Sequence, residues 1–149
     1  MDLVSGVRQL EDKIREMSEG LSKRTFQAVT VAGYRVHRTA LELISQVGTG
    51  RTYKLSHPTR THTAASPGQP PATDTGALKQ SLTVSTEQTM TGAVCSVSSD
   101  LPYAADLEYG TNRMGGAHPW LLPAFLVNEE DNKQSIREAF KEEVLKGAG

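Results

Sequence analysis

The amino-acid sequence predicts an α+β fold with a long N-terminal helical region, a small antiparallel sheet, a short helix, a C-terminal helix and an extended proline-rich loop. Three patterns predict it. Apolar residues recur every three or four positions near both ends of the chain, as in amphipathic helices. Two runs in the second half alternate apolar and small polar residues, as half-buried strands do. The 149 residues are enough for one domain of ordinary size, so 1–149 is expected to form a single domain.

The first helical region is predicted over residues 1–48. Its apolar positions are alternately four and three residues apart, which places them along one face of a helix. This stripe begins with Leu3, Val7, Leu10, Ile14, Met17 and Leu21. The pattern resumes at Val29 and Gly48 is typical of a helix end, so either one helix or two joined near Gly20 would fit. So long a stripe predicts packing against neighbouring copies of the chain, with a two-chain coiled coil as the alternative.

Residues 51–73 are predicted to form an extended loop that projects from the body, because proline disrupts helices and central strands. A short strand at 53–56 is the alternative for one part of it. The loop carries three positive charges and no acid. It is either a solvated flexible segment or an arm that docks to a neighbouring subunit or ring, or touches DNA phosphates. The residues expected to dock are Arg51, Lys54, Arg60, Pro67, Gly68, Pro70 and Pro71.

Residues 74–149 are predicted to hold the sheet and the C-terminal helices. Two antiparallel strands are expected at 82–85 and 93–98. A short helix over 102–110 and a final helix starting near Pro119 are expected to follow. The residues expected to anchor this part of the fold are Gly76, Leu78, Tyr103, Gly110, Pro119, Trp120, Pro123 and Phe125.

Physical reasons support several of these anchors. Gly110 can take the left-handed conformation that closes a short helix. Pro119 and Pro123 suit the approach and first turn of a helix, because amides there have no partner within the helix. Trp120 and Phe125 are expected to be buried, since apolar area contributes about 25 cal/mol per Å² when it leaves water.

The chain carries three short motifs in order. The first, at 66–81, is a Pro-Gly-Gln-Pro-Pro loop followed by Thr-Gly-Ala-Leu and a serine. The second, at 103–111, begins with Tyr-Ala and ends with Glu-Tyr-Gly-Thr, and the third, at 118–125, reads His-Pro-Trp-Leu-Leu-Pro-Ala-Phe. In this order and spacing they resemble the neck or tail-completion proteins of long-tailed bacteriophages, also described as head-tail joining or minor tail proteins.

The resemblance covers about residues 30–126 and implies a non-enzymatic structural subunit of a virion. This chain has His118 where the family commonly has arginine, and Trp120 where phenylalanine is usual. Copies would form a closed head-to-tail ring, a hexamer or alternatively a dodecamer, around the DNA channel. The ring would join the portal, adaptor and head-completion complex of the DNA-filled head to the tail terminator and tail tube.

The implied partners are further copies of the chain, the head-completion or adaptor and tail-terminator proteins, and genomic DNA passing through the lumen without sequence specificity. Surface contacts are expected at Glu108, Tyr109 and Arg113. A tail terminator or head-completion subunit is the nearest alternative function. A DNA-binding accessory protein is the alternative from another class.

Composition argues against other classes of protein. Apolar residues make up 37% of the chain, which suggests a thin core or one completed by partners. The net charge of −1 is not that of a typical nucleic-acid binder. Hydrolase, phosphate-loop and metalloprotease motifs are absent, and His57 and His62 have no cysteine or acidic ligand nearby, so neither an enzyme nor a zinc site is expected. No apolar run approaches the roughly 20 residues that span a bilayer. The expected location is the virion neck, after assembly in the host cytoplasm.

Overall fold

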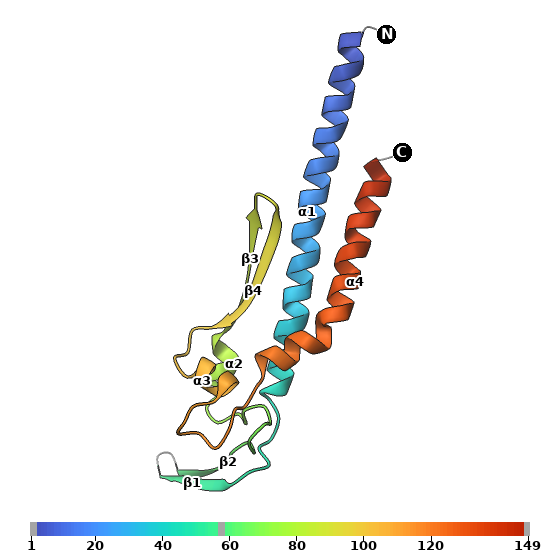
Figure 1. The fold of residues 1–149 in the computed structure, drawn as a ribbon. Helices are drawn as coiled ribbons and strands as arrows, with labels where there is room; N and C mark the ends of the chain where they lie inside the picture. The colour runs from blue at the N-terminus through green and yellow to red at the C-terminus, as the bar shows by residue number, and fades with distance from the viewer. Residues whose placement is uncertain (1–2, 57–58, 148–149) are drawn as a thin grey trace. The chain divides into compact units, whose positions relative to one another are not determined.

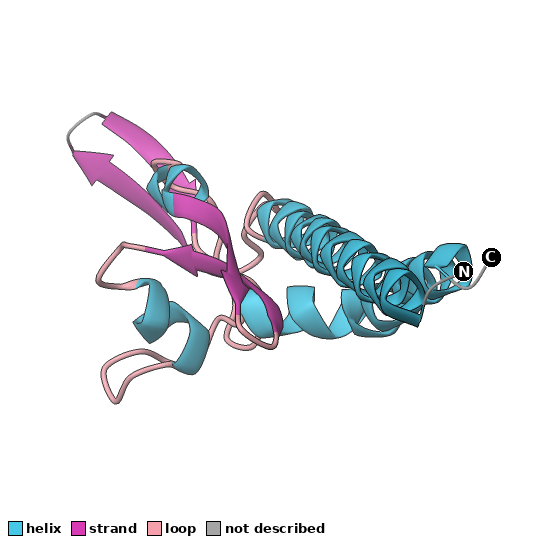
Figure 2. Ribbon diagram, turned by 90° about the horizontal axis from the view of Figure 1, so that it is seen from above, coloured by secondary structure: helices cyan, strands magenta, loops and turns pink. Residues whose placement is uncertain are grey.

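The computed structural model describes residues 3–56 and 59–147, and it confirms the α+β class (Figures 1 and 2). Helices at both ends of the chain flank two small antiparallel sheets and two short helices. The elements in chain order are α1 (Leu3–Leu43), β1 (Thr52–Ser56), β2 (Thr59–Thr63), α2 (Ala77–Ser81), β3 (Leu82–Thr89), β4 (Gly92–Ser99), α3 (Ala104–Tyr109) and α4 (Leu121–Gly147).

The N-terminal region is one continuous helix, so Gly20 does not divide it. Helix α1 ends at Leu43, earlier than the expected glycine at 48. The next residues form a tighter turn, in which the amide of Ser45 donates to the carbonyl of Glu42 at 3.2 Å. The carbonyl of Ile44 accepts a hydrogen bond from a residue distant in sequence, the hydroxyl of Thr73. That carbonyl therefore has a partner without a further helical turn.

The chain folds into two compact units, each built from segments that are distant in sequence. Unit 1 contains the chain up to Ala32, the segment Ser85–Cys95 and the chain from Glu130. Unit 2 contains Gly33–Val84 and Ser96–Glu129. Helices α1 and α4 and strands β3 and β4 each pass from one unit into the other. Neither unit is therefore a separate stretch of the polypeptide.

Strands β3 and β4 lie where the alternating pattern predicted a hairpin, although both are longer than expected. Their turn is at Met90 and Thr91. Strand β1 confirms the alternative of a short strand at 53–56, and strand β2 corrects the expectation of an extended loop over the rest of 51–73. They pair antiparallel from Thr52↔Thr63 to Ser56↔Thr59 and form a second sheet. The prolines at 67, 70 and 71 lie beyond this hairpin, and its threonines favour extended backbone.

The hydrophobic core of unit 2 is small and contains several alanines. Its buried members are Val36, Ala40, Ile44, Leu82, Ala104, Trp120 and Ala124. Trp120 is only 2% exposed and is the largest fully buried side chain described. Its indole N–H has no hydrogen-bond partner among the described residues. Leu78 packs against this core from the side.

The predicted burial of Phe125 is wrong, and the expected anchor Tyr103 is also partly exposed. Phe125 is 48% exposed and Tyr103 is 43% exposed. Trp120 and Ala124 are four residues apart and share the helix face that meets the core, whereas Phe125 follows Ala124 and so points about 100° away from it. In α3, Ala104 likewise lies in the core while the adjacent Tyr103 points away from it.

Replacing Trp120 tests whether its volume or its N–H matters. Trp120→Ala should lower the free energy of unfolding by about 3–5 kcal/mol, because it leaves a large cavity. Trp120→Phe should cost less than about 2 kcal/mol, because it fills most of the space and loses no hydrogen bond. Urea unfolding measures both, with Phe125→Ala as a half-exposed aromatic control. Equal losses for the two Trp120 variants would contradict the burial of an unpaired indole N–H.

Candidate assembly surfaces

The first amides of α4 are held by one carboxylate, that of Glu108. Its Oε2 accepts from the amides of Trp120 at 2.8 Å and Leu121 at 2.9 Å, and its Oε1 accepts from the amide of Leu122 at 2.9 Å. The first amides of any helix lack partners within the helix, and the helix dipole favours a negative charge there. Glu108 was expected as a surface contact, and this needs correction: both of its oxygens are engaged inside unit 2.

The end of α3 lies against the chain that enters α4. The amide of His118 donates to the carbonyl of Leu107 at 2.7 Å. Gly110 has φ 76°, and a Cβ atom there would stand 3.1 Å from the amide nitrogen of Ala117. Both a left-handed backbone and a close neighbour therefore require glycine. The second and third sequence motifs meet here.

The proline loop packs on the same place. The amide of Gly68 donates to the carbonyl of Ala117 at 2.8 Å, and Nδ1 of His118 donates to the carbonyl of Gln69 at 3.0 Å. Pro71 is buried and Pro70 is half-buried. The expectation that this part of the loop projects as an arm is therefore wrong for Pro70 and Pro71. The loop packs here because its backbone groups form hydrogen bonds with the residues that precede α4.

These contacts bring all three motifs into one cluster, which we call the motif cluster: residues 66–71, 107–111 and 116–122 of unit 2. Each segment contributes a backbone group or a carboxylate to another segment of the cluster. Gly76, from the first motif, is outside the cluster and begins α2 with φ 81°. The motifs are thus far apart in sequence and close in space.

The β1–β2 hairpin has two different faces. The register places Tyr53 opposite His62 and Leu55 opposite Arg60, so these four side chains share one face. Nη2 of Arg60 lies 2.6 Å from Oδ1 of Asp74, and its Nη1 donates to the Asp74 carbonyl at 3.1 Å. The positive charge of Arg60 is therefore matched within the chain, which corrects its expected role as a docking cation.

The other face of the hairpin carries hydroxyls and one cation. Its residues are Thr52, Lys54, Ser56, Thr59, Thr61 and Thr63. Lys54 is exposed, and so is Arg51, whose guanidinium lies 5.4 Å from the ring centroid of Tyr53. Because the sheet has two strands, the outer backbone edge of each strand has no strand partner in this sheet. The hairpin thus presents a polar surface with two available positive charges.

Tyr109 and Arg113, expected as surface contacts, are both exposed. Pro67 and Gly68 at the tip of the proline loop are exposed as well, whereas Pro119 and Pro123 are half-buried. The exposed members are available to a partner.

Among the residues described, no cluster of three or more histidine, cysteine, aspartate or glutamate side chains could hold a metal ion. His57, considered above as a possible ligand, lies outside the described residues. None of the helices in the described ranges has an apolar stretch long enough to cross a membrane. Searches found no matching family model, curated protein or solved structure.

Removing the carboxylate of Glu108 tests its role at the start of α4. Glu108→Ala should lower the free energy of unfolding by about 2–3 kcal/mol, because three amides lose a charged acceptor. The control is Glu130→Ala on α4, because the 3.9 Å ion pair of Glu130 with Lys133 is exposed. It should change stability by less than about 0.5 kcal/mol. Denaturant unfolding of both variants checks this, and similar losses would refute the capping role.

Proposed function

We propose that this chain is a non-enzymatic structural subunit of a tailed-bacteriophage neck. Copies form a ring that joins the DNA-filled head to the tail terminator and tail tube around the DNA channel. The observation that carries the proposal is the motif cluster. Each motif alone is common in proteins, but here the three segments that resemble the neck family form one hydrogen-bonded arrangement around the start of α4. Residues that a family shares because they determine its fold are expected to contact one another in this way.

The uncovered apolar side chains support self-association. Large apolar residues are exposed on α1, on α4 and at the β3–β4 turn. They include Val7, Leu10, Ile14, Met90, Leu126, Val127, Phe140 and Leu145. Exposed apolar side chains that gather into a patch usually mark an interaction site, and the neighbours in a ring would cover such side chains. A head-to-tail contact closes into a ring when its rotation divides a full turn. The resemblance favours six copies, with twelve as the alternative.

The charge distribution supports passage of DNA rather than specific binding. The net charge is −1, and Arg60 is paired with Asp74. Arg51 and Lys54 remain as exposed cations on the hairpin. We therefore assign the hairpin to docking against a head-completion or tail-terminator protein, with DNA in the lumen as a non-specific neighbour. Assembly in the host cytoplasm and a final place in the virion neck follow from this function.

The docking role of the hairpin can be tested in the phage that encodes the chain. The double variant Arg51→Ala/Lys54→Ala should give lysates with unjoined heads and tails, because the hairpin loses both of its exposed cations. Negative-stain electron microscopy counts joined particles. The matched control, Arg15→Ala/Lys23→Ala, removes two exposed cations from α1 off its apolar stripe and should leave particles normal. Normal virions from the hairpin variant would refute docking through these charges.

A gel-shift titration separates the structural subunit from a DNA-binding accessory protein. The purified protein should not shift duplex DNA at physiological salt, because its net charge of −1 gives little electrostatic attraction to phosphates. An accessory protein that contacts several phosphates would shift it, and its log affinity would fall with log salt with a slope of about −0.9 per phosphate neutralised. A tight, strongly salt-dependent shift would favour the accessory-protein function over the neck subunit.

A further inference from the structure

Within unit 1, α4 accompanies α1 only along part of its length. Nε of Arg24 lies 3.4 Å from Oε2 of Glu143, and Gly147, the last helical residue, lies against the side chain of Met17. Helix α1 continues beyond this point towards its N-terminus (Figure 1). The segment before Met17 therefore has no companion helix in the described part of unit 1.

This N-terminal segment keeps an apolar face that is bare. Val7, Leu10 and Ile14 follow one another at three and four residues, so they share one helix face. Their side chains are 51%, 60% and 55% exposed. We call these three residues the bare stripe. An apolar helix face with anchors at this spacing typically docks in an apolar groove.

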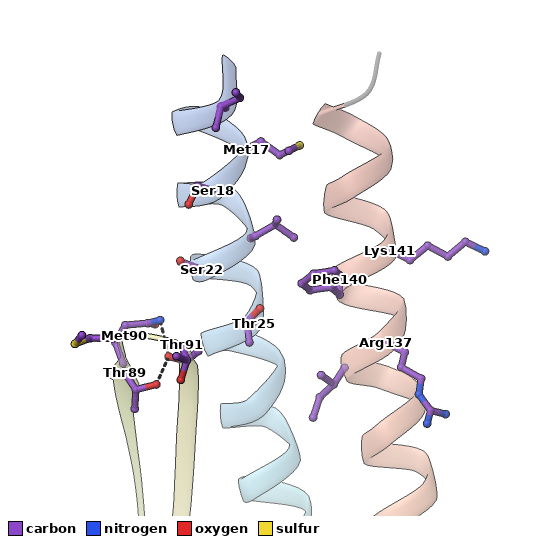
Figure 3. Close-up of a pocket in the computed structure, with 15 residues that line it drawn as sticks. Met17, Ser18, Ser22, Thr25, Thr89, Met90, Thr91, Arg137, Phe140 and Lys141 are labelled. Carbon is purple, nitrogen blue, oxygen red and sulfur yellow. Dashed lines mark hydrogen bonds between the residues drawn. The ribbon is translucent and has the colours of Figure 1, made fainter. Parts of the chain in front are cut away.

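The same face of α1 continues into a trough with two walls (Figure 3). Ile14, Met17 and Leu21 contribute its floor, and its volume is about 610 Å³. One wall is α4, from which Phe140 points towards α1, and the other is the β3–β4 turn at 88–92. The bare stripe and the floor are therefore one continuous face, open at one end and walled at the other, and Ile14 belongs to both.

Both walls are held by contacts inside unit 1. The ion pair between Arg24 and Glu143 joins the α4 wall to α1. In the turn wall, the side chains of Gln88 and Thr89 both donate to the carbonyl of Gly92, at 2.7 and 3.1 Å (Figure 3). A helix that enters the trough must therefore fit between two existing walls.

The walls decide in which direction a second α1 can lie on this face. A partner helix that runs parallel and in register would bring its own α4 and turn to the level where the walls of the first copy stand. An antiparallel partner has its walls at the opposite end. Its bare stripe can then lie between the walls of the first copy, while the bare stripe of the first copy lies between the walls of the partner.

The charged edges of the face fit the same direction. Residues seven apart lie on the same edge of a helix, so Lys13 shares the edge of Gly20, which meets Glu143 of α4. Glu11 shares the opposite edge with Ser18, which lines the trough. When two helices face each other and run in opposite directions, like edges meet.

In the antiparallel pair, Lys13 of each copy therefore lies near the C-terminal end of the partner's α4 helix. The last carbonyls of a helix favour a cation there. Glu11 of each copy lies on the side of the Ser18 hydroxyl, which can donate a hydrogen bond to it. A parallel partner would instead bring the carboxylate of Glu11 to the side of α4, where the helix end repels it. Shape and charge thus favour the same arrangement.

We propose that the free chain forms a two-fold dimer in which the two α1 helices lie antiparallel, with the bare stripe of each copy in the trough of the other. Ile14 lies near the two-fold axis, because it belongs to both surfaces. Val7 of one copy is then level with Leu21 of the other, and the contact runs along about 22 Å of each helix. The same surface is used by both copies, so association stops at two chains.

This inference goes beyond the neck function and does not rest on it. A closed pair leaves neither a bare stripe nor a trough free. The apolar face of α1 is therefore covered in the free chain, before it meets any other protein.

Light scattering coupled to size exclusion tests the pair. The unmodified chain should be a dimer, and Leu10→Glu should raise its dissociation constant by roughly a hundredfold, because a carboxylate then enters the apolar trough of the partner. Asp12→Lys is the matched control. Asp12 lies on the opposite side of α1 from the stripe, so this variant should leave the dimer unchanged. Circular dichroism checks that each variant keeps its helices.

Cross-linking tests the direction. In a Cys95→Ser background, a short bismaleimide should join the double variant Val7→Cys/Ser22→Cys into dimers, because Val7 of one copy lies near Ser22 of the other. Val7→Cys alone and Ser22→Cys alone are the matched controls. Neither should be joined, because the two copies of each residue are about 20 Å or more apart along the paired helices.

The proposal fails if the unmodified chain stays monomeric at high concentration, or if Leu10→Glu leaves the dimer intact. Cross-linking of Val7→Cys alone would indicate a parallel, in-register coiled coil and would overturn the antiparallel pair. These outcomes concern the purified protein alone. They are therefore distinguishable from failure of the neck function, which is judged by the joined particles in lysates.

Discussion

The carboxylate of Glu108 is the interaction on which the rest of unit 2 depends. It gives an acceptor to the amides of Trp120, Leu121 and Leu122, and so decides where α4 begins. That starting point places Trp120 and Ala124 on the side of the helix that faces the core. Without this acceptor the first turn of α4 would fray, and Trp120, which directly precedes α4, would lose its fixed place in the core. A small core with one large aromatic residue tolerates little change of this kind.

The same constraint explains why the proline-rich segment is ordered. Gly110 lets α3 end close to Ala117, and the carbonyl of Ala117 then accepts from Gly68. Pro71 is buried as a result. Proline restricts the backbone of the unfolded chain, so a proline-rich loop loses little conformational entropy on folding. A few hydrogen bonds are then enough to hold it in place. The proline-rich loop, for which a flexible segment was one expectation, is therefore packed within unit 2. The β1–β2 hairpin that precedes it presents the polar surface.

Much of the fold could be predicted from local patterns, because helical periodicity and strand alternation are local properties. Helices α1 and α4 and the β3–β4 hairpin follow from them. The end of α1 at Leu43 could not be predicted, since it depends on Thr73, which is distant in sequence. Strand β1 was predicted only as an alternative and strand β2 was not predicted, because the prolines at 67, 70 and 71 disfavour strands while the threonines before them favour extended backbone.

The errors in the candidate site have a similar origin. Phe125 was expected to be buried as a large aromatic side chain, although the four-residue spacing of Trp120 and Ala124 identifies the buried face of α4. Glu108 was expected to be a surface contact. Its partners lie across a glycine-rich loop whose path no local pattern predicts, so only the structure could place them.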